Sequence, residues 1–104
     1  MTEKQKMLMG ILYNAEDQAL IEERNHAKSL TRQFNEHWED KGRRNYLIGQ
    51  IFGSLGKNVH LEAPIYLDYG YRTTIGSDFF SNFNLTILDL SLIHISEPTR
   101  LRRI

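Results

Sequence analysis

The apolar residues in the first half of the chain recur at the three-to-four spacing of helices. No proline interrupts residues 4–55, and the apolar positions do not alternate as they would in exposed strands. The pattern predicts a short helix from about Lys4 to Tyr13, a longer helix after Asp17, and a third helix from Arg43 to Leu55. Asp17 suits an N-cap because its carboxylate can accept backbone N–H hydrogen bonds, and Gly56 suits a C-terminal stop.

Each predicted helix has one apolar face. The faces consist of Met7, Leu8, Ile11 and Leu12 in the first helix, Leu20, Ala27, Leu30, Phe34 and Trp38 in the second, and Leu47, Ile48, Ile51, Phe52 and Leu55 in the third. Three short helices cannot bury these faces among themselves, so we expect another element to pack against them.

The pattern changes after Gly56. Residues 59–88 are rich in β-branched and aromatic residues and are divided by turn residues. Two series of residues have a spacing of six, and these are Val59, Ile65 and Tyr71, then Ile75, Ser81 and Ile87. A spacing of six is typical of a hexapeptide β-helix, but an antiparallel meander of short strands also fits. The spacing alone leaves both architectures open.

Composition narrows the function classes. A chain of 104 residues fits a single small domain, and its 13 basic and 13 acidic residues give no net charge that would favour nucleic acid. It has no cysteine, so it has neither disulfides nor a thiolate metal site. It shows neither a signal peptide nor an apolar run long enough to span a membrane, and we therefore expect a cytoplasmic protein without a membrane partner.

Two stretches carry a resemblance to a known family. They are Gly10-Ile-Leu-Tyr13 with Glu22-Glu-Arg24, and Asp68-Tyr-Gly-Tyr71 continuing through Ile75-Gly76 to Phe79-Phe-Ser-Asn-Phe-Asn-Leu-Thr-Ile-Leu-Asp89. Residues 4–89 resemble the maltose and galactoside O-acetyltransferases. The resemblance implies an α+β fold, with a helical cap over residues 1–56 and the start of a left-handed parallel β-helix over residues 57–89, which is truncated here.

The resemblance also implies a function. Family members transfer acetyl from acetyl-CoA to a sugar hydroxyl, and they are homotrimers with active sites between neighbouring β-helices. Their catalytic histidine and most acetyl-CoA contacts lie beyond the matched stretch, and neither His60 nor the other three histidines (His26, His37 and His94) stands in the family's catalytic context. We therefore assign no catalytic residue and no metal ligand. The alternative to an enzyme is a non-catalytic binding or assembly module with the same N-terminal part.

Four positions match sugar-binding positions of the family: Asn82, Asp68, Arg24 and Asp89. An amide or carboxylate at such positions can bind sugar hydroxyls by paired hydrogen bonds. Asn82 could instead stabilise a β-helix corner, Asp68 could be a solvated turn residue, and Arg24 could be a solvated helix residue. Ala15 stands where galactoside enzymes have an acidic acceptor contact, which favours a maltose or glucose type of acceptor.

The last fifteen residues, 90–104, read as a translated sequencing adaptor rather than native protein. Leu90 to Arg100 is one reading frame of the transposon-end adaptor used to prepare DNA libraries, and the last four residues would be index sequence. Without this segment 13 − 3 = 10 basic and 13 − 1 = 12 acidic residues remain, a net charge of −2. We expect the chain on its own to be poorly stable and inactive, because a β-helix needs several stacked turns.

Overall fold

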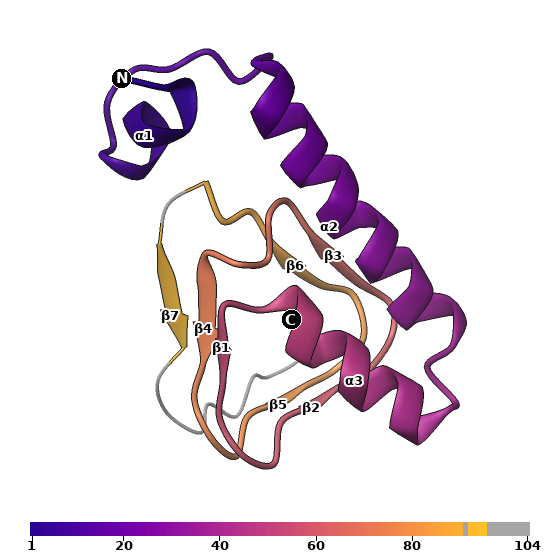
Figure 1. Ribbon diagram of the computed structural model, residues 1–104. Helices are drawn as coiled ribbons and strands as arrows, with labels where there is room; N and C mark the ends of the chain where they lie inside the picture. Colours follow the sequence, from indigo (N-terminus) through magenta and orange to yellow (C-terminus); the bar gives the residue numbers. More distant parts are fainter. Residues whose placement is uncertain (91, 96–104) are drawn as a thin grey trace.

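Three helices precede a coil of short strands in the computed structural model, which describes residues 1–90 and 92–95 (Figure 1). The helices are α1 (Glu3–Leu8), α2 (Gln18–Glu36) and α3 (Lys41–Ile51). The strands in this part of the chain are β1 (Ser54–Leu55), β2 (His60–Leu61), β3 (Ile65–Leu67), β4 (Thr73–Ile75), β5 (Phe80–Ser81), β6 (Leu85–Ile87) and β7 (Ile93–Ile95). No helix within the described residues is long and apolar enough to cross a membrane.

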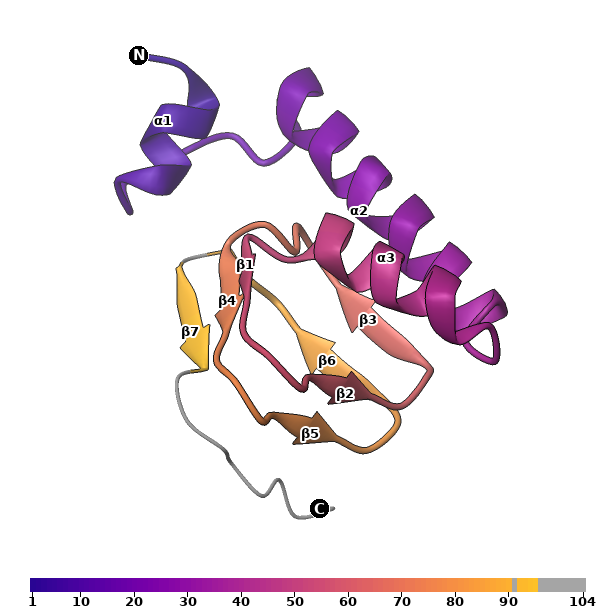
Figure 2. The ribbon, with the colours of Figure 1, turned by 60° about the horizontal axis from the view of Figure 1, so that its bottom comes forward.

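The strands form three narrow parallel sheets, in the orders β1-β4-β7, β2-β5 and β3-β6. Ser54 pairs with Thr74, His60 with Phe80, and Ile65 with Leu85, so that each strand meets the residue 20 positions further along. The chain therefore winds as a coil with three sides, which Figure 2 shows most directly. The predicted fold class is confirmed: a helical cap is followed by the first turns of a left-handed parallel β-helix. Parallel pairing throughout excludes the meander.

One of the two six-residue series faces the interior of the coil. Ile75, Ser81 and Ile87 are 1%, 2% and 6% exposed, as predicted. The series of Val59, Ile65 and Tyr71 does not face the interior throughout, because Tyr71 is 37% exposed. The residues that stack beneath the second series are Leu55, Leu61 and Leu67, which are also six apart.

The first helix is shorter than predicted, because it ends at Leu8 rather than Tyr13. Gly10 takes a φ of +75° and donates its N–H to the Met7 carbonyl oxygen at 3.1 Å, a geometry that ends the helix. Met7 is buried, but Leu12 is 95% exposed. The predicted apolar face therefore reduces mainly to Met7, which packs against α2.

The third helix also ends early, at Ile51 rather than Leu55. Phe52 is extended, and the Gly53 N–H donates to the Thr73 carbonyl oxygen at 3.0 Å. Leu55 lies in β1 and pairs with Ile75. Pairing with β4 thus replaces the helical hydrogen bonds that the local pattern favoured, and Gly56 belongs to the coil rather than to a helix end.

The second helix begins as predicted and joins the cap to the coil, but it ends at Glu36, so Trp38, which was predicted on its apolar face, lies beyond it. Asp17 caps it by accepting a hydrogen bond from the Ala19 N–H at 3.2 Å. In both views α2 runs beside β3 (Figures 1 and 2), and residues from α2, α3 and the coil share one core. The core members are Phe34, Leu47, Ile48, Ile51, Phe52, Leu61, Ile65, Leu67, Ile75, Phe79 and Ile87. The cap and the coil are therefore expected to unfold together.

Asn35 fixes α2 against the first turn of the coil, because its side chain makes two hydrogen bonds to the backbone of Ile65. Its Nδ2 donates to the Ile65 carbonyl oxygen at 3.0 Å, and its Oδ1 accepts the Ile65 N–H at 2.9 Å. We expect Asn35→Ala to lower the free energy of unfolding by about 1 to 3 kcal/mol, because two partly buried backbone groups lose their partner. Urea denaturation followed by circular dichroism measures this change. Asn25→Ala, at an exposed position of the same helix, should change it by less than about 0.5 kcal/mol. Equal effects would contradict the role of Asn35.

Strand β7 lies inside the segment that we identify as adaptor. Ile93 pairs with Thr73 and Ile95 with Ile75, which continues the register of the coil. Ser91 and residues 96–104 of that segment lie outside the described residues. The pairing does not bear on the DNA origin of the segment, and its identification as adaptor stays a prediction.

Candidate functional site

Arg24 is held by two hydrogen bonds where α2 meets the coil. Its Nη1 donates to the Tyr69 hydroxyl oxygen at 2.9 Å, and its Nη2 donates to the Ala15 carbonyl oxygen at 2.8 Å. The bond to Tyr69 raises the pKa of Arg24 above its usual value, and the carboxylates of Glu16 and Asp68 add to this although burial opposes it. Arg24 is therefore a fixed cation rather than a freely solvated one.

Asp89 belongs to the same corner of the coil, but it is completely buried. Its Oδ1 accepts the backbone N–H of Tyr69 at 2.8 Å, and its Oδ2 accepts the Thr73 hydroxyl at 3.2 Å. Neither oxygen is free to meet a sugar in this chain. Asp89 instead fixes the backbone of Tyr69, whose hydroxyl holds Arg24, so it acts on the site through its neighbours.

Asp68 follows β3 and lies beside these residues. It is half-buried, and within the described residues its carboxylate has no hydrogen-bond partner. It lines a groove of about 430 Å³ between α2 and the coil, together with Lys28, Arg32, Tyr66 and Leu88. A free carboxylate beside an aromatic ring and cationic side chains can bind the hydroxyls of a polar ring-shaped ligand.

Asn82 lies at a different corner of the coil. It follows β5 and precedes β6, whereas Asp68 follows β3 and precedes β4. Asn82 is half-buried, and its backbone carbonyl accepts the Ser81 hydroxyl at 2.9 Å. Its amide makes no hydrogen bond within the part of the chain that the structure describes, so it is available to a ligand. One chain thus brings Arg24, Asp68 and Asp89 together and leaves Asn82 apart.

His60 occupies β2, where its environment is aromatic and acidic. Its Nε2 contacts the Glu62 carboxylate, and its ring stacks on Phe80 with centroids 5.1 Å apart. The Trp38 ring meets it edge-on at 6.0 Å. These contacts are those of a packed side chain. We therefore still assign no catalytic role to His60.

For Tyr69 the sequence allows either stacking on a sugar face or packing in the core, with the core favoured. Tyr69 is 3% exposed and packs with Met7 and Leu20, so the core assignment is correct. Its hydroxyl nevertheless accepts from Arg24, and its backbone donates to Asp89. A buried tyrosine needs a hydrogen-bond partner for its hydroxyl. From this rule a contact between Tyr69 and a cation on α2 could have been predicted.

The geometry defines a class of protein: a helix-capped, hexapeptide-repeat β-helix with a polar corner between its cap and its coil. Residues 6–56 match the family model described as the maltose acetyltransferase hexapeptide capping motif. A maltose O-acetyltransferase structure from Clostridium difficile 630 superposes with a TM-score of 0.86 at 43% identity, over 91% of this chain and 52% of that one. The chain belongs to the maltose and galactoside O-acetyltransferase family.

Two further relatives extend the comparison. The galactoside O-acetyltransferase of Escherichia coli K12 is 36% identical over 82% of this chain and 42% of its own length. A hexapeptide-repeat acetyltransferase from Vibrio cholerae O1 biovar eltor, solved in complex with acetyl coenzyme A, has a TM-score of 0.82 at 29% identity, over 92% of this chain and 52% of that one. The chain spans about half the length of the relatives it matches. Acetyl-CoA is the co-substrate of the family.

Proposed function

We propose that this chain is part of an acetyl-CoA-dependent sugar O-acetyltransferase. The observation that carries the proposal is the joint match of cap and coil to a maltose O-acetyltransferase, with a TM-score of 0.86 at 43% identity. The chain accounts for about half of that protein, so the residues described here supply acceptor binding rather than the complete reaction.

The reaction is a direct transfer. The sugar hydroxyl oxygen attacks the thioester carbonyl carbon, a C–O bond forms, the C–S bond breaks, and coenzyme A leaves as its thiol after taking up a proton. A histidine of the family outside the matched stretch takes the hydroxyl proton. Within the matched stretch, Asp68 accepts hydrogen bonds from sugar hydroxyls. Arg24, fixed by Tyr69, presents its charge beside Asp68, and the amide of Asn82 contacts the acceptor or the acyl group.

The separation of these residues supports a site shared between copies of the chain. Asp68 and Asn82 lie at different corners of the coil, so one ligand of monosaccharide size does not contact both within one chain. In a homotrimer of parallel coils, the Asp68 corner of one copy faces the Asn82 corner of the next. We propose this arrangement for the full-length parent, in agreement with active sites between neighbouring β-helices.

The acceptor is proposed to be of the maltose or glucose type. Ala15 offers Arg24 only a backbone carbonyl, at 2.8 Å from Nη2, and presents no carboxylate to a sugar. A galactoside enzyme of the family has an acidic contact at this position. An acetylation assay of the parent with maltose, glucose and a galactoside would test the preference, and faster turnover of the galactoside would overturn it.

We expect the purified 104-residue chain to show no acetyl-CoA turnover with maltose, measured as release of the coenzyme A thiol. The reason is that no histidine of this chain stands in the family's catalytic context, and removal of a general base alone slows such reactions by about 100-fold to 10,000-fold. Turnover above the rate without protein would contradict the assignment of the base outside this chain.

Reading the source DNA across codons 89 to 104 tests the proposal itself. A reading frame that continues past Asp89 into further hexapeptide turns, with a histidine in the family's context, would support the acetyltransferase. A native gene that encodes residues 90–104 and then stops would overturn both the adaptor and the enzyme. The binding or assembly module would then be favoured, and a heat-stable trimer of residues 1–89 would be its signature.

A further inference from the structure

A second cavity lies between α3 and the first turn of the coil, away from the sugar-site residues. It has a volume of about 370 Å³, and its walls come from α2, α3, β1, β2 and the turn between the two strands. Phe34, Ile48, Leu55, Val59 and Leu61 contribute its apolar surface. Ligand pockets in proteins start at about this volume, so the cavity can hold a small organic molecule.

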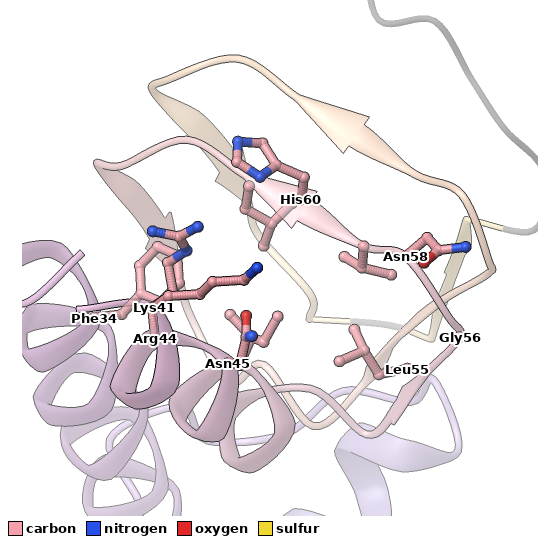
Figure 3. A pocket seen from close by; sticks show the side chains of 11 residues that line it. Phe34, Lys41, Arg44, Asn45, Leu55, Gly56, Asn58 and His60 are labelled. Atoms are coloured by element: carbon pink, nitrogen blue, oxygen red, sulfur yellow. The ribbon is translucent and has the colours of Figure 1, made fainter. Parts of the chain in front are cut away.

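The polar part of this cavity is cationic. Lys41 and Arg44 line it together with two amide side chains and His60, and no carboxylate is among its lining residues in the described part of the chain. Figure 3 shows Lys41 and Asn45 pointing from α3 toward the coil across the cavity. Within the described residues, neither Lys41 nor Arg44 takes part in an ion pair. Lys41 is exposed and Arg44 is half-buried, so the two cations line a partly apolar cavity without an ion-pair partner among these residues.

Arg44 is held in place before any ligand arrives. Its Nη1 donates to the Trp38 carbonyl oxygen at 2.7 Å, and its guanidinium carbon lies 4.5 Å from the centroid of the Trp38 ring. Stacking and a backbone hydrogen bond together leave the remaining N–H groups of the guanidinium free to donate. A cation that is already ordered loses less entropy when it binds an anion.

Three carboxylates lie near the cavity. Asp40 precedes Lys41 and caps α3 by accepting the Arg43 N–H at 3.2 Å. Glu62 contacts the Nε2 of His60, and Asp78 accepts a hydrogen bond from the Asn58 side chain at 3.0 Å. None of the three lines the cavity. The residues that line the cavity therefore carry positive charge without a carboxylate among them, which favours an anion over a neutral ligand.

We propose that this cavity binds a small organic phosphate, with the phosphate at Lys41 and Arg44 and the organic body against the apolar wall. Two cations match the double charge of a phosphate monoester better than the single charge of a carboxylate. The site contains neither Asp68, Asn82 nor Arg24, so it is separate from the proposed acceptor site. A ligand in this cavity would contact both α3 and the first turn of the coil, and it would therefore stabilise the folded chain.

Phenyl phosphate is the probe that tests this proposal on the full chain. Its binding can be followed by calorimetry and by the fluorescence of Trp38, the single tryptophan of the protein. We expect saturable binding that weakens as salt is added. Phenol has the same ring without the charge, and it should bind at least about 10-fold more weakly, because a charge-assisted hydrogen bond contributes that much. Benzoate should also bind more weakly than phenyl phosphate.

Lys41→Gln should raise the Kd for phenyl phosphate by about 10-fold, since it removes one charged donor. Arg43→Gln is the matched control, because Arg43 is an exposed neighbour on the same helix that does not line the cavity, and its Kd should stay within about twofold. Lys41 is exposed, so this variant should keep the far-ultraviolet spectrum of the parent chain. The proposal fails if phenyl phosphate does not bind saturably, if phenol or benzoate binds as tightly, or if both variants weaken binding equally.

Discussion

Gly56→Ala should lower the free energy of unfolding by about 3 kcal/mol or more, a large share of the roughly 5 to 15 kcal/mol that stabilises a typical domain. A Cβ at position 56 would lie 2.6 Å from the carbonyl carbon of Gly76 and 2.7 Å from the Cα of Ser77. These atoms are backbone of the next turn of the coil, and the Gly56 N–H already donates to the Ile75 carbonyl oxygen at 2.8 Å. Neither turn can move away without losing that pairing.

Gly49→Ala provides the matched control for this substitution. Gly49 lies inside α3, and a Cβ there would meet no atom within 4 Å. Alanine in a helix interior is more stable than glycine by about 0.5 to 1 kcal/mol, so this variant should unfold at a higher temperature than the parent chain. Thermal unfolding followed by circular dichroism compares the two variants directly. If Gly56→Ala unfolded at the temperature of the parent, the close stacking of the two turns would be wrong.

The sequence predicted the second helix well because its apolar face is long and its cap is local. Asp17 and the residues of that face act within a few turns of one helix, so periodicity is sufficient. The ends of α1 and α3 could not be predicted in this way. Gly10 ends α1 through a left-handed backbone conformation, and α3 ends because β1 pairs with β4, whose residues lie about 20 positions away. Tertiary pairing decides such boundaries.

The six-residue spacing identified the coil but not its starting point. The first turn offered two apolar series six apart, and only the one that begins at Leu55 stacks under Ile75. Which series stacks depends on where the first strand begins. That strand lies in residues whose hydrophobic pattern predicts a helix. The spacing from Leu67 to Ile75 is eight rather than six, so the repeat could not be followed backward from the second turn.

The candidate site was predicted from the family resemblance rather than from the hydrophobic pattern. The resemblance identified positions, but it did not predict whether their side chains are exposed. Arg24 and Asp68 lie together at one corner, as a shared ligand would require. Asp89 was chosen by the same route, but the register of the coil places it under Tyr69 and inside the protein. Exposure depends on which residue stacks above a given position, and this information is not local in the sequence.

Asp89→Ala should therefore act on stability, with an expected loss of about 3 kcal/mol in the free energy of unfolding. The substitution leaves the Tyr69 N–H and the Thr73 hydroxyl without partners in a completely buried place, and each such loss costs about 1 to 3 kcal/mol. Asp89→Asn should lose less, because its amide oxygen can still accept the Tyr69 N–H and Thr73 can accept from its NH₂ group.

Asp68→Ala separates this structural role from a sugar-binding role. Both aspartates are predicted by resemblance to bind the sugar, but Asp68 is half-buried and its carboxylate is free of hydrogen bonds within the described residues. Its removal should change the free energy of unfolding by less than about 0.5 kcal/mol. Urea denaturation of the three variants measures the contrast. If Asp89→Ala were as mild as Asp68→Ala, the Asp89 carboxylate would not be a buried partner of Tyr69, and it would return to the set of direct sugar contacts.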